Sequence, residues 1–355
     1  MIPPQDRPVT RLPAADLDAV VQRAAPAWDD LRDARVFITG ASGFVGSWLL
    51  ESLLAANRAK QLGVHVTALV RDRDTFAARF PHLMTDAALR IHVGDVRMAD
   101  PPTRAFTHIV HSASAATPRM NAEQPDEVVD LIEHGTERMC EEAESTKGTR
   151  LLQLSSGSIY GTPPVPPTGI PESFAGRAHA VEGAERFGTA KWRAEQRVQL
   201  ACTRGVHGVC ARVFALFGPR LPLDGQFALG NFMGDALAGR PITLLSDGTA
   251  VRSWLYAADL AAWCWVLLTH GKNGAAYNVG SEESYDLRTA ASRVAALATP
   301  PVSLEFAGSA PATSHGHASH YVPSIALART ELGLDAWTSF DDGIRRMWRW
   351  HREDT

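Results

Sequence analysis

The sequence has little of what a membrane-spanning or secreted protein needs. Its longest apolar run, Leu260 to Leu268, is far shorter than the roughly 20 residues of a membrane span, so we expect a soluble protein without membrane contact. The N-terminal stretch MIPPQDRPVTRLP lacks the apolar core behind a basic start that marks a secretion signal. Cysteine is scarce and has no Cys-x-x-Cys spacing, so we expect free thiols and a cytoplasmic location for Cys140, Cys202, Cys210 and Cys264.

No charge of one sign dominates either. The chain has 35 Lys and Arg against 39 Asp and Glu, a net charge of −4, and it has no long basic run. This balance argues against nucleic acid as a partner. The length of 355 residues, with 45% hydrophobic and 21% charged residues, is that of a globular chain with one large or two modest domains.

The pattern along the chain predicts an α/β fold of the Rossmann type. Residues 1–33 read as an N-terminal extension with a helix from Ala14 to Ala24, which caps the main domain or a partner subunit. Residues 34–217 alternate short apolar strands with helices, as in a doubly wound parallel sheet that binds a dinucleotide. Residues 218–355 are predicted to form mainly a smaller, substrate-binding lobe, with segments around 245–280 returning to the first domain.

Individual elements of that pattern are also predicted. Strands are expected at 36–38, 64–70, 90–93, 108–111 and 151–154, with helices at 48–56 and after Gly188. The stretch 307–320 is rich in Gly, Ser, Ala and His, and it is expected to be a mobile surface loop. Because alternate histidines in such a loop lack supporting groups, we expect no metal site at His315, His317 and His320.

A glycine-rich turn follows the first strand of the main domain. Gly40, Gly43 and Gly46 are spaced Gly-x-x-Gly-x-x-Gly directly before a predicted helix. Gly40 permits the tight turn, Gly43 lets a pyrophosphate approach the backbone, and Gly46 lets the helix pack close to the sheet. The free N–H groups of the helix start then face the phosphates, so the turn, with Ser42, Phe44 and Val45, is predicted to bind a dinucleotide.

Several stretches resemble, in the same order, the motifs of one enzyme family. They are TGASGFVGSWLLESLL from Thr39, Gly94-Asp95-Val96, His111-Ser112-Ala113, Ser155-Ser156-Gly157-Ser158-Ile159-Tyr160-Gly161, Gly218-Pro219, Arg252-Ser253-Trp254 through Asp259, and Tyr277-Asn278-Val279-Gly280. From about Arg35 to the C-terminus the chain is similar to the extended short-chain dehydrogenase/reductases, the NAD-dependent epimerase/dehydratase group that works on nucleotide sugars. The resemblance implies that Asp95 and Val96 flank the adenine and that Ala113 also binds the cofactor.

The choice between NAD and NADP depends on the end of the second strand. An acid there bonds the adenosine ribose hydroxyls, and a base favours a 2′-phosphate. Arg71 and Arg73 favour NADP slightly, while Asp72 can serve NAD.

The resemblance also implies a catalytic set, and one member is missing. The family places a Ser or Thr four residues before the tyrosine of the motif that holds Tyr160, and a Tyr-x-x-x-Lys pair on the next helix. Its tyrosine takes the proton of a sugar hydroxyl, and its lysine holds the nicotinamide ribose and lowers the phenol pKa from about 10. Ser156 and Lys191 fit two of these positions, but Phe187 stands in the tyrosine position.

Phe187 leaves three explanations open. It is an inactivating replacement made to trap a ligand, or a natural variant that uses another acid/base, or the mark of a protein that binds a nucleotide sugar without converting it. Loss of a positioned acid/base removes about 10² to 10⁴ in rate. The nearest titratable stand-ins are Tyr160, His179 and Glu185, although a structural or solvated role fits each of them better.

The substrate pocket is predicted from the same resemblance. Related 4,6-dehydratases have an Asp-Glu pair after the catalytic Ser or Thr, whereas Gly157 and Ser158 follow Ser156 here and carry no group for eliminating water. These three residues are expected to contact the sugar. Asn231 and Arg252 are expected to hold its diphosphate, the alternatives being a turn amide and a surface ion pair. Ala215 replaces a common family Asn, so the phosphate cradle is unusual.

The leading hypothesis is an NAD(P)-dependent epimerase or 4-ketoreductase of nucleotide sugars. The alternatives are a catalytically silent binding protein on the same scaffold and a nucleotide-sugar decarboxylase. A homodimer is expected, paired through the helix that carries Lys191 and the helix near Asp126 to Glu142, because this family often pairs so.

Overall fold

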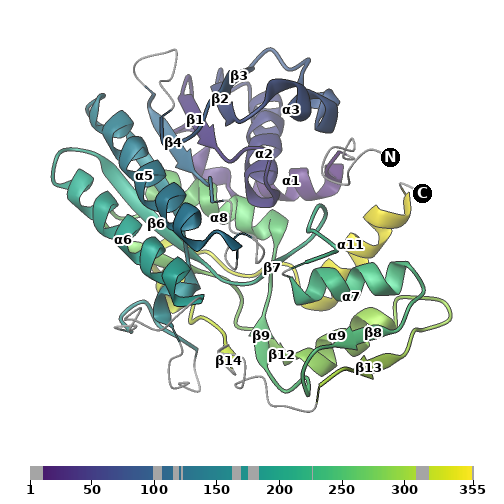
Figure 1. The fold of residues 1–355 in the computed structure, drawn as a ribbon. Helices are drawn as coiled ribbons and strands as arrows, with labels where there is room; N and C mark the ends of the chain where they lie inside the picture. The colour runs from purple at the N-terminus through teal and green to yellow at the C-terminus, as the bar shows by residue number, and fades with distance from the viewer. Residues whose placement is uncertain are drawn as a thin grey trace.

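The computed structural model describes residues 11–98, 106–114, 120, 123–161, 169–174, 184–225, 227–308 and 320–353. Within these residues the largest sheet has seven strands, all parallel (Figure 1). In chain order they are β1 (Arg35–Thr39), β2 (His65–Val70), β3 (Leu89–Val93), β4 (His108–His111), β5 (Arg150–Ser156), β6 (His207–Val213) and β11 (Ala276–Val279). The strand order β11-β6-β5-β4-β1-β2-β3 is that of a doubly wound sheet, so the predicted fold class is confirmed.

Helices cover both faces of this sheet. The helices on one face are α5 (Pro125–Glu144) and α6 (Ala184–Cys202), and those on the other are α2 (Phe44–Lys60) and α8 (Ala257–His270). Around them lie α1 (Ala14–Arg23), α3 (Arg73–Arg79) and α10 (Ala326–Leu332), with short 3₁₀ helices at Ala25–Ala27, Pro81–Leu83 and Gly157–Tyr160. This three-layer arrangement buries the apolar strands on both sides.

The apolar run noted in the sequence is a core helix. In α8 every residue from Ala257 to Thr269 is buried, because α8 packs on the sheet and is itself covered by α1, α2 and α10. Trp265 donates its indole N–H to Ser52 Oγ at 2.9 Å, and Trp263 donates to the Asp335 carbonyl at 2.9 Å. Among the described residues, no helix combines the length and the apolar character needed to cross a membrane.

A smaller lobe is built from later segments of the chain (Figure 1). Its helices are α7 (Ala228–Leu237), α9 (Leu287–Ala295) and α11 (Phe340–Glu353). Its short sheets are β13 (Leu304–Phe306) with β8 (Ile242–Leu244), β10 (Leu255–Tyr256) with β7 (Leu216–Phe217), and β12 (Ser284–Asp286), β9 (Val251–Ser253) and β14 (His320–Tyr321) side by side.

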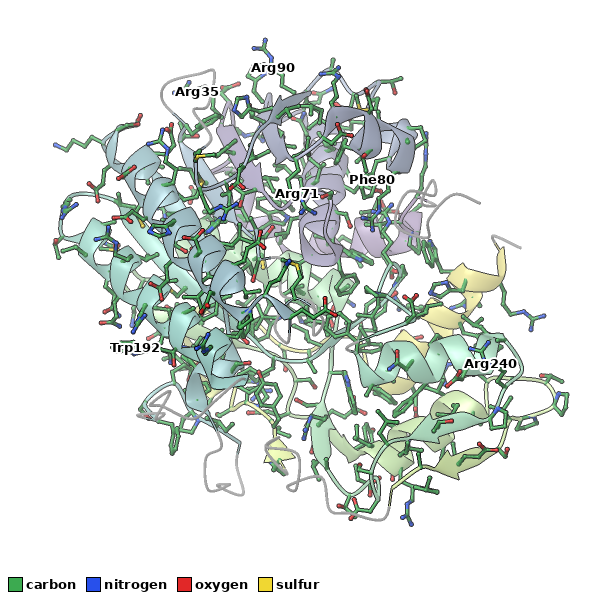
Figure 2. The ribbon with its side chains drawn as sticks, in the orientation of Figure 1. Arg35, Arg71, Phe80, Arg90, Trp192 and Arg240 are labelled. Atoms are coloured by element: carbon green, nitrogen blue, oxygen red, sulfur yellow. The ribbon has the colours of Figure 1, made fainter. Side chains whose placement is uncertain are left out.

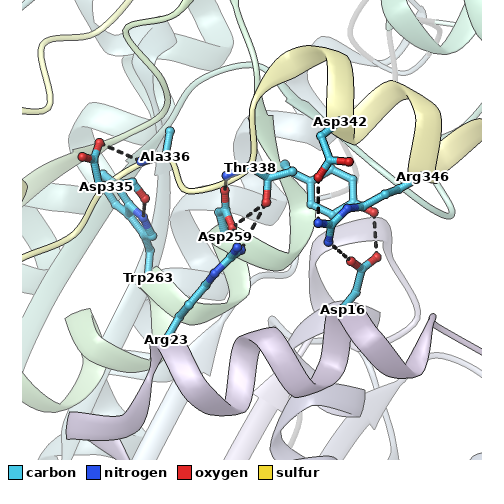
Figure 3. A network of polar contacts seen from close by, with 10 residues as sticks. Asp16, Arg23, Asp259, Trp263, Asp335, Ala336, Thr338, Asp342 and Arg346 are labelled. Carbon is cyan, nitrogen blue, oxygen red and sulfur yellow. Dashed lines mark hydrogen bonds and ion pairs between the residues drawn. The ribbon is translucent and has the colours of Figure 1, made fainter.

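The N-terminal helix α1 is tied to the main body by buried charges (Figure 3). Arg23 pairs with Asp259 at the start of α8. Asp16 accepts the Tyr256 hydroxyl at 2.6 Å and a guanidinium N–H of Arg346 at 2.8 Å. Because Asp16 and Asp259 are buried, each depends on its partner to offset the cost of desolvation. The helix expected at 14–24 therefore packs on its own chain.

Some predicted boundaries need correction. The helix expected after Gly188 begins at Ala184, so Phe187 and Gly188 both lie inside it. The helix expected at 48–56 extends from Phe44 to Lys60, because Gly43 already acts as its N-cap. Of the predicted loop 307–320, His320 lies in β14, and His315 and His317 are outside the described residues. All four cysteines are free thiols.

Candidate active site

The predicted cofactor-binding residues on loops follow the carboxyl ends of strands of the large sheet. The glycine turn follows β1, Arg71 and Asp72 follow β2, Asp95 and Val96 follow β3, and Ala113 follows β4. Thr39 at the end of β1 lies beside His111 of β4 and Leu69 of β2. The strand order reverses here, because β2 lies next to β1 on one side of the sheet and β4 lies next to β1 on the other. In doubly wound sheets ligands bind in the crevice outside such a reversal of strand order.

The glycine turn has the geometry that phosphate binding requires. Gly40 has a φ of +69°, and a Cβ there would lie 2.7 Å from the Ala113 backbone nitrogen. A Cβ at Gly46 would overlap the Gly40 carbonyl. Gly43 is exposed and caps α2 without a side-chain hydrogen bond, while Ser42, Phe44 and Val45 beside it are only partly buried. The start of α2 is therefore open to a ligand.

A buried hydrogen-bond cluster fixes β1 to β4 next to this turn. Thr39 Oγ1 lies 2.7 Å from His111 Nδ1 and accepts the Ala113 N–H at 3.2 Å. Ser112 Oγ donates to the Thr39 carbonyl at 2.6 Å. Burial lowers the pKa of His111 to about 3, so its ring is neutral. This cluster holds Ala113 against Gly40.

The end of β2 presents two exposed arginines around a capping acid. Asp72 is the N-cap of α3 and accepts the Thr75 N–H at 2.6 Å. Hydrogen bonds from Thr75 lower the pKa of Asp72. Arg71, labelled in Figure 2, and Arg73 are exposed. Because the Asp72 carboxylate already accepts a bond from the helix start, it is a weaker candidate for holding a ribose than its position in the sequence indicated.

Asp95 and Val96 follow β3, and neighbouring residues of the same chain fix their positions. Asp95 accepts two bonds from the Arg97 guanidinium, at 2.6 and 2.9 Å, and Arg97 also reaches Asp130 at 2.6 Å. Hydrogen bonding to Arg97 lowers the pKa of Asp95. Val96 is buried beside Gly135 of α5. The two residues thus form a fixed wall near the end of the sheet.

Ser156 and α6 meet at the end of β5. Ser156 caps the 3₁₀ helix that follows, accepting the Ser158 N–H at 3.1 Å, and its hydroxyl donates to Ser158 Oγ at 3.1 Å. A Cβ at Gly188 would overlap the Ser158 carbonyl, so α6 crosses this 3₁₀ helix at close range. That close approach fixes the register of α6 against the strand.

Lys191 and Phe187 share one face of α6. Lys191 is buried and donates to the Leu154 carbonyl at 2.8 Å. Burial lowers its pKa to about 8. The Phe187 ring centre lies 5.7 Å from Lys191 Nζ, and the half-buried ring also packs against Val128 and Ile132 of α5. The ring therefore occupies the place beside the lysine that the spacing of four residues predicts.

Comparison with models of protein families identifies the family of this chain. Residues 36–280 match the model of the NAD dependent epimerase/dehydratase family. The chain belongs to this family. The prediction made from its ordered motifs is confirmed.

Individual relatives of the family are distant in sequence and close in fold. UDP-glucuronic acid decarboxylase 3 of Arabidopsis thaliana is 24% identical over 88% of this chain and 87% of its own. The epimerase Mth375 of Methanothermobacter thermautotrophicus superimposes with a TM-score of 0.78 at 19% identity, over 93% of this chain and 96% of its own. MoeE5 in complex with UDP-glucuronic acid and NAD superimposes with a TM-score of 0.74 at 21% identity, over 90% of this chain and 100% of its own.

In this member of the family, Tyr160 does not fit as a stand-in for the missing tyrosine. Tyr160 is buried, donates to Asn278 Oδ1 at 2.8 Å and accepts from Arg212 at 2.8 Å, so its hydroxyl serves a structural network. Burial raises the pKa of Tyr160 far above its usual value. His179 and the side chain of Glu185 lie outside the described residues.

The two predicted diphosphate ligands differ in how they are held. The Asn231 amide accepts from the Gly225 N–H and donates to the Gly225 carbonyl, both at 3.0 Å, which is the turn-amide role named as its alternative. Arg252 is half-buried and donates to the Val251 carbonyl at 2.8 Å. In the part of the chain that the structure describes, no carboxylate pairs with Arg252.

The contacts of two residues of the site carry no signal in the sequence. Glu195, which follows Lys191 on α6 as the family frame does, is buried and accepts from Ser155 of β5 and from Arg212 of β6. Tyr321 of β14 brings its hydroxyl to Ser156 and Ser158. Both depend on contacts between distant segments, which no local pattern reveals.

Proposed function

We propose that this chain uses NAD or NADP to modify a nucleotide-activated sugar, by epimerisation or 4-keto reduction. The observation that carries the proposal is the buried Lys191, which lies on α6 where that helix crosses the 3₁₀ helix after Ser156. A buried amine with a pKa lowered to about 8 is costly to the fold, and such groups are typical of functional sites.

The residues present fit a dinucleotide. A side chain at Gly40 or Gly46 would close the cradle, and the exposed Gly43 leaves the α2 start open to a pyrophosphate. Asp95, Val96 and Ala113 would line the adenosine half, and Lys191 would hold the nicotinamide ribose. When bound, the dinucleotide supplies hydride transfer.

The chain's own polar groups would orient the sugar. The Ser156 hydroxyl, which donates to Ser158 Oγ at 3.1 Å, would bond a sugar oxygen. Gly157 and Ser158 bring no carboxylic acid, which disfavours elimination of water. Arg252, without a carboxylate partner among the described residues, would bond the diphosphate, and Asn231 would contribute only by releasing its bonds to Gly225.

Decarboxylation is the second candidate function. It is favoured by the names of six Arabidopsis thaliana relatives, all called UDP-glucuronic acid decarboxylase, which are 24 to 26% identical over 88% of this chain. The solved MoeE5 complex with UDP-glucuronic acid has the same fold. This candidate needs the same cofactor and the same Lys191.

The experiment combines the purified chain with NAD or NADP, oxidised or reduced, and with UDP-glucose, UDP-galactose or UDP-glucuronic acid, and follows the sugar by proton NMR. We expect one sugar to be converted, with epimerisation, reduction and decarboxylation told apart by the product. Binding of a nucleotide sugar without conversion, by the native chain and by Phe187→Tyr alike, would show a silent binding protein instead.

Cofactor preference is predicted to depend on the exposed arginines after β2. Replacing both Arg71 and Arg73 with Ala should weaken NADP binding by roughly 1 to 3 kcal/mol, the range of charge-assisted contacts, with little change for NAD. Titration calorimetry of both dinucleotides measures this. Equal losses for the two would show that these arginines do not bind a 2′-phosphate.

A homodimer is proposed through the outer faces of α5 and α6. These faces carry a row of ion pairs within the chain, Arg186–Asp126, Arg193–Glu133, Arg197–Glu137 and Arg204–Glu144. Beside them Trp192 (Figure 2) and Leu200 are 42% and 41% exposed. Large apolar side chains exposed on a helix pair are typical of interfaces.

Light scattering at micromolar concentration should give the mass of a dimer. Trp192→Glu should shift it toward the monomer, because burying an unpaired carboxylate opposes association. Arg240→Glu, at an exposed site on the other lobe, is the control and should leave the mass unchanged (Figure 2). A native chain with the mass of a monomer contradicts the prediction.

A further inference from the structure

Tyr321 occupies space that a side chain at position 157 would need. A Cβ added at Gly157 would lie 2.5 Å from the Tyr321 hydroxyl oxygen and 2.8 Å from the Phe214 ring. Ser156 and Ser158 lie near enough to the same hydroxyl to act against the rise of its pKa. A phenol thus reaches the site from β14, at the place where the main-chain segment after Ser156 has no side chain of its own.

The surroundings hold this phenol firmly. The Phe214 and Tyr321 ring centres are 4.5 Å apart, and Tyr321 lies in register with Arg252 of β9, whose guanidinium carbon is 6.0 Å from the ring centre. The next residues are tied down as well, since Ile170 donates to the Val322 carbonyl at 2.9 Å. Tyr321 as a whole residue is only partly buried.

We propose that Tyr321 is the catalytic proton carrier of this chain, acting from β14 in place of the tyrosine that Phe187 replaces on α6. This inference rests on the proposed function and assigns a residue to it. Ser156 would bond the same sugar oxygen, so the phenol and the serine together would form the contact that active family members make with residues on β5 and α6.

The proton step is a transfer from oxygen to oxygen. In the reducing direction the Tyr321 O–H bond would break and its proton would form an O–H bond with the sugar carbonyl oxygen. A bound reduced dinucleotide would supply the hydride for the carbon. The phenolate left behind is stabilised by Arg252, Ser156 and Ser158 until water returns a proton. In the oxidising direction the same atoms exchange the proton the other way.

The protonation state fits the donor role. Burial raises the pKa of Tyr321 to about 12, while Ser156, Ser158 and Arg252 act against that rise. The phenol is therefore protonated at neutral pH and serves better as an acid than as a base. His320, next in sequence, has its pKa lowered by burial and by Arg252, so it is neutral and leaves the charge balance unchanged.

The test is Tyr321→Phe, with Tyr285→Phe as matched control. Tyr285 of β12 also lies in register with Arg252 of β9, but its hydroxyl donates to Glu283. Tyr321→Phe should lower kcat at least about 10²-fold, and Tyr285→Phe should stay within about twofold of the native rate. Binding of UDP-glucose and UDP-glucuronic acid without dinucleotide is measured by calorimetry. Tyr321→Phe should lose 2- to 10-fold in affinity and Tyr285→Phe should not, because one hydrogen bond contributes about 1 kcal/mol.

A double variant separates catalysis from structure. Phe187→Tyr placed in Tyr321→Phe supplies a phenol from α6, so it should restore turnover to at least the native level. A Tyr321→Phe rate within threefold of native overturns the proposal, and so does a loss of rate that Phe187→Tyr leaves unrestored. If the native chain neither binds nor converts any nucleotide sugar, the proposed function itself fails, and that outcome is distinct from both.

Discussion

Replacing Phe187 with Tyr should raise turnover of the nucleotide sugar at least about 10²-fold. The Phe187 ring lies half-buried on the face of α6 that carries Lys191, 5.7 Å from its Nζ. A phenol in this place lies next to a cation that lowers its pKa, whereas burial raises the pKa of Tyr321 to about 12. The new phenol should therefore exchange its proton faster than Tyr321 does. Because only the hydroxyl is new, binding of dinucleotide and nucleotide sugar should change little.

Turnover and melting temperature of the same pair of proteins decide the outcome, with Phe187→Leu as a control that lacks the hydroxyl. The close approach of Gly188 to the Ser158 carbonyl fixes the helix register and supports a gain in rate. If the added hydroxyl found no partner, it would lower stability by roughly 1 to 3 kcal/mol without a gain. Lower stability with unchanged turnover contradicts the placement of Phe187 at the catalytic tyrosine position.

Lys191→Met should abolish turnover and yet stabilise the fold at pH 7. The ammonium is buried, and burial lowers its pKa from 10.5 to about 8, which corresponds to on the order of 3 kcal/mol of unfavourable burial. Methionine has a similar length and no charge to desolvate. We expect its free energy of unfolding at pH 7 to exceed the native value by about 1 to 3 kcal/mol.

The pH dependence gives the sign of this effect. Below pH 8 the lysine is charged in both the folded and the unfolded chain, so the native protein bears the full cost. Between pH 8 and 10.5 the folded chain releases its proton first, and native stability should rise relative to Lys191→Met. Urea unfolding at pH 7, 9 and 10 measures the difference. A variant less stable than the native chain at pH 7 contradicts a desolvated lysine.

The local parts of the site were predictable from the sequence. A single phosphate-binding turn requires Gly40, Gly43 and Gly46. Phe187 and Lys191 are four residues apart, so they lie on one face of a helix. These features depend on short stretches whose geometry follows from backbone and helix periodicity. The fold class followed in the same way from alternating strands and helices.

The parts that depend on distant pairing were not predictable. Tyr321 enters the site because β14 pairs with β9, a contact between segments with no shared local pattern. Asn231 sits in a promising motif, yet its amide holds the Gly225 turn. Asp72 caps α3, since a short polar side chain before a helix readily bonds its first turn, and its contact with the cofactor stays a prediction.

Titration calorimetry of the native chain with NAD and with NADP tests the central claim most directly. That claim is that the turn from Gly40 to Gly46 and the buried Lys191 form one dinucleotide site. The account predicts saturable binding of at least one dinucleotide, lost in Gly46→Val, where a side chain would overlap the Gly40 carbonyl. A native chain that is folded by circular dichroism and binds neither dinucleotide would contradict it.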